Sequence, residues 1–169
     1  MSNRNIIIGT LAIVVGLIVW VANSGDSGGG TAKAAPDFTL STLDGSEITL
    51  SDYEGDKPVI LDFWASWCPN CRRDMPRLNA MYEEYGADIE VIGVNLRESK
   101  AVAQGYVDTA GILFPIVLDT KGVTAGAYNV RNTNTHVLIN KDGTIHSTIS
   151  GDIRESHIKK LIEAQGGGS

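Results

Sequence analysis

The chain has 169 residues, of which 43% are hydrophobic, and it carries a formal net charge of −6. This length suits one domain of ordinary size with a real core. The negative charge argues against nucleic acid as a partner, because nucleic-acid binding calls for a basic patch. The only two cysteines lie three residues apart, so cysteine usage does not indicate a disulfide-stabilised scaffold.

An uncharged apolar run occupies residues 6–22, after a polar segment at 1–5 that includes Arg4. At about 1.5 Å per residue, a helix of this length spans about 25 Å, near the lower limit for crossing a bilayer. Arg4 before the run and Asp26 after it favour a cytoplasmic N-terminus and an extracytoplasmic C-terminal domain. We therefore expect a single-pass protein of the cell membrane, with a transmembrane anchor or uncleaved signal at 6–22. A cleaved signal peptide is the alternative, because Ala32-Lys33-Ala34 is a small-x-small site.

Residues 23–36 are rich in Gly, Ser and Ala, which predicts a flexible linker. The globular domain is expected to follow at 37–165. It opens with two short alternating segments, 38–40 and 47–50, separated by turn residues that include Asp44-Gly45. This pattern is typical of a β-hairpin.

The two cysteines lie between a predicted strand and a predicted helix. Residues 59–64 form an apolar, partly β-branched run, as in a buried strand. Residues 69–85 carry apolar side chains at helical spacing, and Gly86 is a helix-ending residue. Cys68 is therefore expected at the N-terminus of this helix, with Cys71 one turn later.

Strands alternate with helices through the rest of the domain, which ends in a hairpin with an Asp-Gly turn and an amphipathic helix. This order predicts an α/β sandwich with a mixed sheet. The predicted elements are strands at 89–95 and 112–119, helices at 99–110, 123–128 and 154–165, and a hairpin over 136–150. Residues 166–169 are expected to be a disordered tail.

The position of the cysteines predicts redox chemistry. Aligned peptide dipoles at a helix N-terminus stabilise an anion, and the thiolate is the species that attacks disulfides. Cys68 is therefore the predicted nucleophile, and Cys71 is predicted to resolve the mixed disulfide, with no cofactor besides this pair. A structural zinc site needs four ligands, and His136, His146 and His157 show no ligand spacing. An inert disulfide would close too short a loop to stabilise much.

The run Asp62-Phe63-Trp64-Ala65-Ser66-Trp67-Cys68-Pro69-Asn70-Cys71, followed by Pro76, resembles the thioredoxin superfamily. The chain is most similar to its membrane-anchored TlpA/ResA type, whose domain opens with a pattern like that from Pro36 to Tyr53. The resemblance implies a thioredoxin-like three-layer sandwich with a mixed central sheet. The resemblance also implies that an N-terminal β-hairpin is added to this fold and that one transmembrane helix precedes the domain.

The resemblance also implies roles for site residues. Asp62 matches a buried aspartate that relays protons to the inner cysteine. Contact with the substrate is expected from Trp67, Pro69, Thr133 and Asn134.

Asn134 stands where this superfamily places a cis-proline beside the cysteines. Because a cis bond costs a non-proline residue about 2.5–4 kcal/mol, we predict a trans Thr133–Asn134 bond. A tolerated variant and an altered function are both open interpretations of this substitution.

Four further residues have two interpretations each. Asp74 is predicted to be an exposed helix residue paired with Arg73 or Arg77; alternatively, it places a second negative charge near the site. His136 is predicted to be a solvated or hydrogen-bonded residue at a strand start; alternatively, it approaches the cysteines as a third metal ligand. Arg72 and Arg73 are predicted to be solvated, although they would also suit an acidic partner. No metal site is predicted.

The resemblance implies an extracytoplasmic thiol–disulfide oxidoreductase whose partners are protein thiols and disulfides. It would reduce exported proteins such as apocytochrome c during cytochrome c maturation, with electrons from a membrane thiol donor. A general disulfide oxidant is an alternative, because the sequence does not set the reduction potential.

Three other classes of protein remain open. A copper-handling protein of the Sco type uses Cys-x-x-x-Cys, one residue longer than the spacing here. A peroxidase of the peroxiredoxin kind would need Thr or Ser three residues before the cysteine, where this chain has Ala65. A non-catalytic adaptor would not need the cysteines.

Overall fold

The computed structural model describes residues 33–166. The described residues do not include the predicted segments at 1–5 and 6–22, residues 23–32 of the predicted linker or residues 167–169 of the predicted tail. Between residues 33 and 166, no helix has the length and apolar character needed to cross a bilayer.

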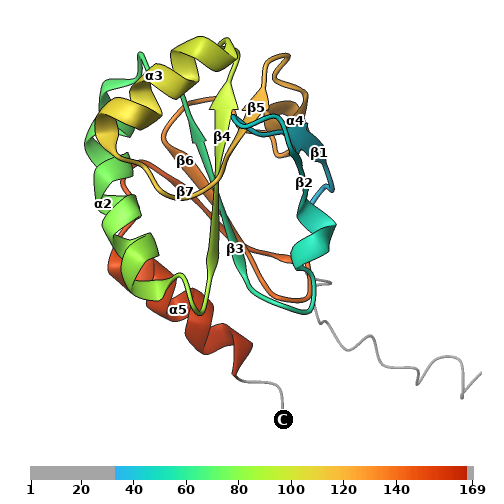
Figure 1. The fold of residues 1–169 in the computed structure, drawn as a ribbon. Coiled ribbons are helices and arrows are strands. Elements are labelled where there is room, and N and C mark those ends of the chain that lie inside the picture. The colour runs from blue at the N-terminus through green and yellow to red at the C-terminus, as the bar shows by residue number, and fades with distance from the viewer. Residues whose placement is uncertain (1–32, 167–169) are drawn as a thin grey trace, which may run out of the picture. The chain divides into compact units, whose positions relative to one another are not determined.

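The centre of the domain is a mixed five-stranded sheet with the order β5-β4-β3-β6-β7 (Figure 1). The parallel pairs are β3–β4 and β4–β5, and the antiparallel pairs are β3–β6 and β6–β7. The strands are β3 (Val59–Trp64), β4 (Glu90–Leu96), β5 (Ile116–Asp119), β6 (Thr135–Ile139) and β7 (Ile145–Ser150). Every residue of the central strand β3 is buried, as its mainly apolar composition predicts.

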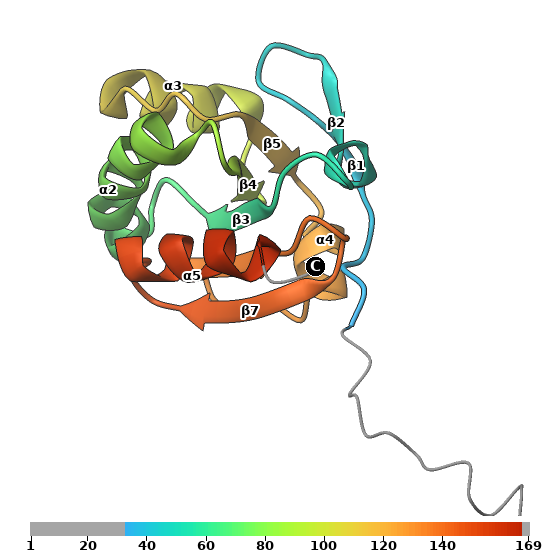
Figure 2. The ribbon, with the colours of Figure 1, turned by 90° about the horizontal axis from the view of Figure 1, so that it is seen from below.

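Each face of the sheet is covered by a separate layer (Figures 1 and 2). Side chains alternate along β3, so Ile60 and Trp64 join the core with helices α2, α3 and α5, while Leu61 and Phe63 face the opposite layer. The helices are α2 (Pro69–Tyr85), α3 (Lys100–Ala110) and α5 (Glu155–Gln165). The opposite layer contains β1 (Thr39–Ser41), β2 (Glu47–Thr49), the 3₁₀ helix η1 (Leu50–Tyr53) and α4 (Val123–Ala127). The predicted three-layer sandwich, mixed sheet and N-terminal hairpin are confirmed.

The helix boundaries follow local signals in the sequence. Cys68 is the N-cap of α2, with Pro69 in its first turn, where a missing N–H costs no helical hydrogen bond. Ser99 caps α3, because its side chain accepts a hydrogen bond from the Val102 N–H. Gly111 ends α3 with φ 65°, a left-handed conformation that suits glycine.

The predicted strand at 112–119 is too long at its N-terminal end. Pro115 has no N–H to donate to a sheet, and β5 begins only at Ile116. Ile112 and Phe114 are buried in the core as parts of a loop, and Leu113 is exposed. The apolar run therefore reflects burial of this segment rather than strand structure along its whole length.

The last residues of the predicted linker form hydrogen bonds with the turn between β6 and β7 and with the start of β7. The Ala35 N–H donates to the Gly143 carbonyl, and the Ile145 N–H donates to the Lys33 carbonyl. The Tyr128 hydroxyl donates to the Pro36 carbonyl at 2.7 Å. Within the described residues, ordered structure therefore begins before residue 37.

Candidate active site

Cys68 and Cys71 form a disulfide at the start of α2, with their Cα atoms 5.3 Å apart. Cys68 is 4% exposed and Cys71 is fully buried, so the first cysteine lies nearer to solvent. The Cys68 sulfur accepts a hydrogen bond from the Cys71 N–H at 3.2 Å. This bond and the helix dipole favour negative charge on Cys68, as the sequence predicts.

The loop between β3 and the cysteines is held by Glu98. Its carboxylate accepts hydrogen bonds from the Ser66 N–H at 2.8 Å and the Ser66 hydroxyl at 2.6 Å. It also accepts one from the Asn95 side chain at 2.7 Å. The adjacent Trp67 is 67% exposed, which leaves its ring available for contact with another molecule. Glu98 could not be predicted from the sequence, because nothing in its local spacing connects it to Ser66.

Asp62 is buried in the layer between β3 and α2. Its side chain shares the face of β3 that carries Ile60 and Trp64, and this face packs against α2 and Cys71. Burial raises the pKa of Asp62 to about 6; the charge of His136 partly offsets this rise, and that of Asp74 adds to it. A carboxyl group with such a pKa exchanges protons near neutral pH.

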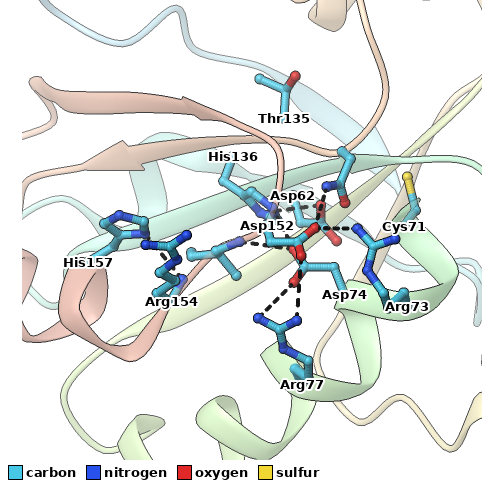
Figure 3. A network of polar contacts seen from close by, with 12 residues as sticks. Asp62, Cys71, Arg73, Asp74, Arg77, Thr135, His136, Asp152, Arg154 and His157 are labelled. Atoms are coloured by element: carbon cyan, nitrogen blue, oxygen red, sulfur yellow. Dashed lines mark hydrogen bonds and ion pairs between the residues drawn. The ribbon is translucent and has the colours of Figure 1, made fainter. Parts of the chain in front are cut away.

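His136 lies between Asp62 and Asp74 (Figure 3). Its Nδ1 is 3.4 Å from Asp62 Oδ1, and its Nε2 is 3.1 Å from Asp74 Oδ2. Asp74 Oδ2 also accepts a hydrogen bond from the Ile153 N–H at 3.0 Å. All three side chains are 1% exposed. The structure therefore contains a cluster of three buried ionisable groups, Asp62, His136 and Asp74, which we call the buried triad.

Two interpretations of single residues are wrong about the exposure of the side chain. Asp74 is buried, because it lies at i+3 from Cys71 on the inward face of α2; its Oδ1 is 3.9 Å from Arg77, and Arg73 pairs with Asp152 instead. His136 is hydrogen-bonded, as predicted, but it is not solvated. Its ring nitrogens contact carboxylates rather than the cysteines, and no metal-binding group of three or more His, Cys, Asp or Glu residues occurs within 33–166.

The loop before β6 has the backbone geometry expected without proline. No peptide bond in the described part of the chain is cis, so the predicted trans Thr133–Asn134 bond is confirmed. Asn134 has φ 59°, in the left-handed region. Its N–H donates to the Phe63 carbonyl at 2.9 Å, and its carbonyl accepts from the Gly151 N–H at 2.8 Å. These bonds attach the loop to the end of β3 that leads into the cysteines.

An exposed ion-pair network joins this loop to α2. Asp152 accepts a hydrogen bond from Arg73 at 2.8 Å and lies 3.5 Å from Arg77 (Figure 3). The hydrogen bond from Arg73 lowers the pKa of Asp152. The Asn134 side chain donates to the same carboxylate at 3.4 Å. Arg72 is exposed, as expected, and Arg73 is not simply solvated.

The structure brings Asp62 and both cysteines to one end of β3 and α2. Trp67 and Pro69 are exposed at the same helix start, and Asn134 is tied to Phe63 beside them. Asp152 and Glu98 are polar residues of the site that could not be predicted from the sequence.

Replacing Asp62 with asparagine is expected to change how stability depends on pH. Burial raises the pKa of Asp62 from 3.8 to about 6, so the folded state binds a proton more tightly than the unfolded state does. The stability contributed by this proton is complete below pH 3.8 and is lost as the pH rises through 6. The melting temperature of Asp62→Asn minus that of the parent, measured by thermal unfolding, should therefore increase between pH 3.8 and about pH 6. A constant difference would contradict the raised pKa.

A disulfide closed within the first turn of a helix, directly after the central strand of a mixed sheet, defines a thioredoxin-like thiol–disulfide oxidoreductase. A family model described as the AhpC/TSA family matches residues 31–148, and the chain belongs to this family. It is 39% identical over 133 residues to the thiol-disulfide oxidoreductase ResA of Geobacillus kaustophilus, covering 78% of this chain and 76% of the relative.

Two solved structures support the same assignment. A thiol:disulfide interchange protein DsbE from Chlorobium tepidum has a TM-score of 0.72 and 34% identity, covering 80% of this chain and 97% of that one. A secreted disulfide oxidoreductase of Mycobacterium tuberculosis, homologous to E. coli DsbE, has a TM-score of 0.66 and 26% identity, covering 75% and 95% of the two chains.

Proposed function

We propose that this protein is a membrane-anchored, extracytoplasmic reductant of protein disulfides. The observation that carries the proposal is the pair Cys68–Cys71 at the start of α2, together with the buried carboxyl of Asp62 on the face of β3 that packs against α2. The location is supported by the apolar run at 6–22. It is also supported by the similarity to a secreted oxidoreductase.

In the proposed cycle, the Cys68 thiolate attacks a substrate disulfide and forms a mixed disulfide, releasing one substrate thiol. Cys71 then gives its proton to Asp62 and attacks the Cys68 sulfur. This second step closes the Cys68–Cys71 disulfide and releases the second substrate thiolate, which is protonated by solvent. A membrane thiol donor supplies the two electrons that restore the dithiol, and no other cofactor takes part.

Substrate contact is assigned to the surface around the cysteines. Trp67 and Pro69 are exposed at the start of α2, and Thr133 is half-buried in the adjoining loop. Asn134 is buried, so its contribution is to hold this loop against Phe63. Among exported substrates we propose apocytochrome c before haem attachment, on the strength of the similarity to a protein named ResA.

The reduction potential of the Cys68–Cys71 pair tests the direction of the reaction. The full chain in detergent would be equilibrated with dithiol buffers, and we expect a value near about −250 mV or lower, in the range of reducing thioredoxins. A value near about −120 mV would make the protein an oxidant and would overturn the proposal. Normal covalent haem attachment in cells lacking the gene would remove the cytochrome c assignment alone.

A further inference from the structure

The buried triad is an unusual feature of the core, because three ionisable groups lie together at 1% exposure. Burying charge is costly unless the charges are paired and hydrogen-bonded. Here each nitrogen of His136 has a carboxylate oxygen beside it, at 3.4 Å for Asp62 and 3.1 Å for Asp74. A neutral imidazole has one N–H donor, whereas the imidazolium has two. In this structure Nε2 makes a hydrogen bond with Asp74, whereas Nδ1 lies at ion-pair distance from Asp62 without a hydrogen bond. An imidazolium would place a positive charge between the two carboxylates and give Nδ1 a proton to donate.

The triad lies on the same side of the sheet as the inner cysteine. Asp62 and His136 are directly opposite each other in the antiparallel β3–β6 ladder. Asp74 lies at i+3 from Cys71, and both are on the buried face of α2. Figure 3 shows Cys71 on the α2 ribbon that also carries Asp74. The triad therefore connects the candidate base of the redox site to a second carboxylate on α2.

We propose that His136 is a positioning residue of the redox site, which holds Asp62 as a carboxylate and so keeps it able to accept the Cys71 proton. This inference rests on the roles proposed for Cys71 and Asp62. Within residues 33–166, Asp62 Oδ2 has no hydrogen-bond partner, and the other oxygen, Oδ1, lies 3.4 Å from His136 Nδ1. One carboxylate oxygen is therefore left to accept a proton. When Cys71 attacks the Cys68 sulfur of the mixed disulfide, the Cys71 proton moves to Asp62. Asp62 later releases this proton, and the positive charge of His136 then stabilises the Asp62 carboxylate.

The other charged and titratable groups around the triad are consistent with this arrangement. On α2, Arg77 lies 3.9 Å from Asp74 and adds positive charge on that side. Asp152 is neutralised by Arg73 and Arg77. The charge of Asp62 also acts on Tyr106 of α3, and the charge of His136 acts on His157 of α5. Burial alone lowers the pKa of His136, but the Asp62 charge and the hydrogen bond to Asp74 outweigh it and raise this pKa above its usual value.

The protonation state of His136 is measured directly by ¹⁵N NMR of the histidine rings in the full chain in detergent. We expect both ring nitrogens of His136 to carry protons at neutral pH, because the neighbouring carboxylates raise the pKa of His136 above its usual value. A neutral tautomer at neutral pH would overturn the proposal. This measurement needs no substitution and so does not depend on whether a variant folds.

The second test separates the two chemical steps with 5,5′-dithiobis(2-nitrobenzoate) as the disulfide probe. The reduced protein releases one thionitrobenzoate when Cys68 attacks and a second when Cys71 closes the disulfide. In His136→Gln the loss of the positive charge should raise the pKa of Asp62 further above about 6. We expect the second release to slow about tenfold at neutral pH, which corresponds to a rise of about two pKa units at the base, with the first release unchanged. The difference should vanish at alkaline pH, where the Cys71 thiol ionises without a base. His146→Gln, at an exposed position of β7, is the matched control. Both thionitrobenzoate releases of this variant should proceed at the rates of the parent.

The outcomes distinguish this inference from the proposed function. If Asp62→Asn slows the second release and His136→Gln does not, the role of His136 is wrong and that of Asp62 stands. Equal slowing of both releases in His136→Gln would mean that His136 acts through general structure, which would also overturn the inference. If Asp62→Asn leaves the second release unchanged, the proposed proton transfer to Asp62 itself fails.

Discussion

Replacing Cys68 with serine is expected to reduce disulfide reductase activity by about a thousandfold or more, because a hydroxyl does not replace a thiolate as the nucleophile. Cys68 is the N-cap of α2, and its sulfur receives the Cys71 N–H. A serine oxygen also accepts such a bond, so the helix start should be retained. Insulin reduction followed by turbidity measures the loss, and circular dichroism checks the fold.

The corresponding change at Cys71 is expected to give a different result. Cys71→Ser retains the attacking sulfur but lacks the group that closes the disulfide, so a substrate should remain covalently attached to Cys68. Mass spectrometry of the variant mixed with a disulfide-bonded peptide should show the adduct. If Cys68→Ser accumulated the adduct and Cys71→Ser did not, the assigned order of the two cysteines would be reversed.

The second large effect is expected at Asn134, when it is changed to proline. Proline requires φ near −65° and has no N–H, whereas Asn134 has φ 59° and donates to the Phe63 carbonyl. We expect Asn134→Pro to lower the free energy of unfolding by about 3 kcal/mol, from the backbone mismatch and the lost hydrogen bond. Urea denaturation measures this difference. The residue typical of this fold family would thus be unfavourable in this loop.

Asn134→Gly is the matched control for this change. Glycine adopts the left-handed conformation without strain and keeps the N–H, so only the side-chain bond to Asp152 is lost. The expected loss is within about 1 kcal/mol. If the proline variant proved as stable as the glycine variant, the loop would not depend on the conformation seen at Asn134.

Most of the fold could be predicted from local patterns along the chain. The buried strand β3, the helix from Pro69 to Tyr85 and the final hairpin and helix each follow from hydrophobic periodicity, turn residues or capping positions. The Cys-x-x-Cys spacing at a strand-to-helix junction was enough to predict where the disulfide would lie. The exception was β5, where apolar residues in a buried loop have the same composition as a strand.

The surroundings of the cysteines could not be predicted in this way. Asp62 and Asp74 were each interpreted without reference to His136, which lies 62 residues beyond Asp74. Their meeting depends on the register of β6 against β3, which sets His136 opposite Asp62. It also depends on which face of α2 turns inward.

The elements of the fold and the position of the redox pair could be inferred from the amino-acid sequence, because they depend on residues close together in the chain, and the motif around the cysteines indicated the type of protein. The three-dimensional arrangement was needed to show that Asp74 and His136 are buried, that Glu98 holds Ser66 and that Asp152 joins the Asn134 loop to α2. Hydrogen bonds and ion pairs between distant segments form only after the apolar faces have packed. The polar residues that take part in them therefore carry no periodic signal of their own.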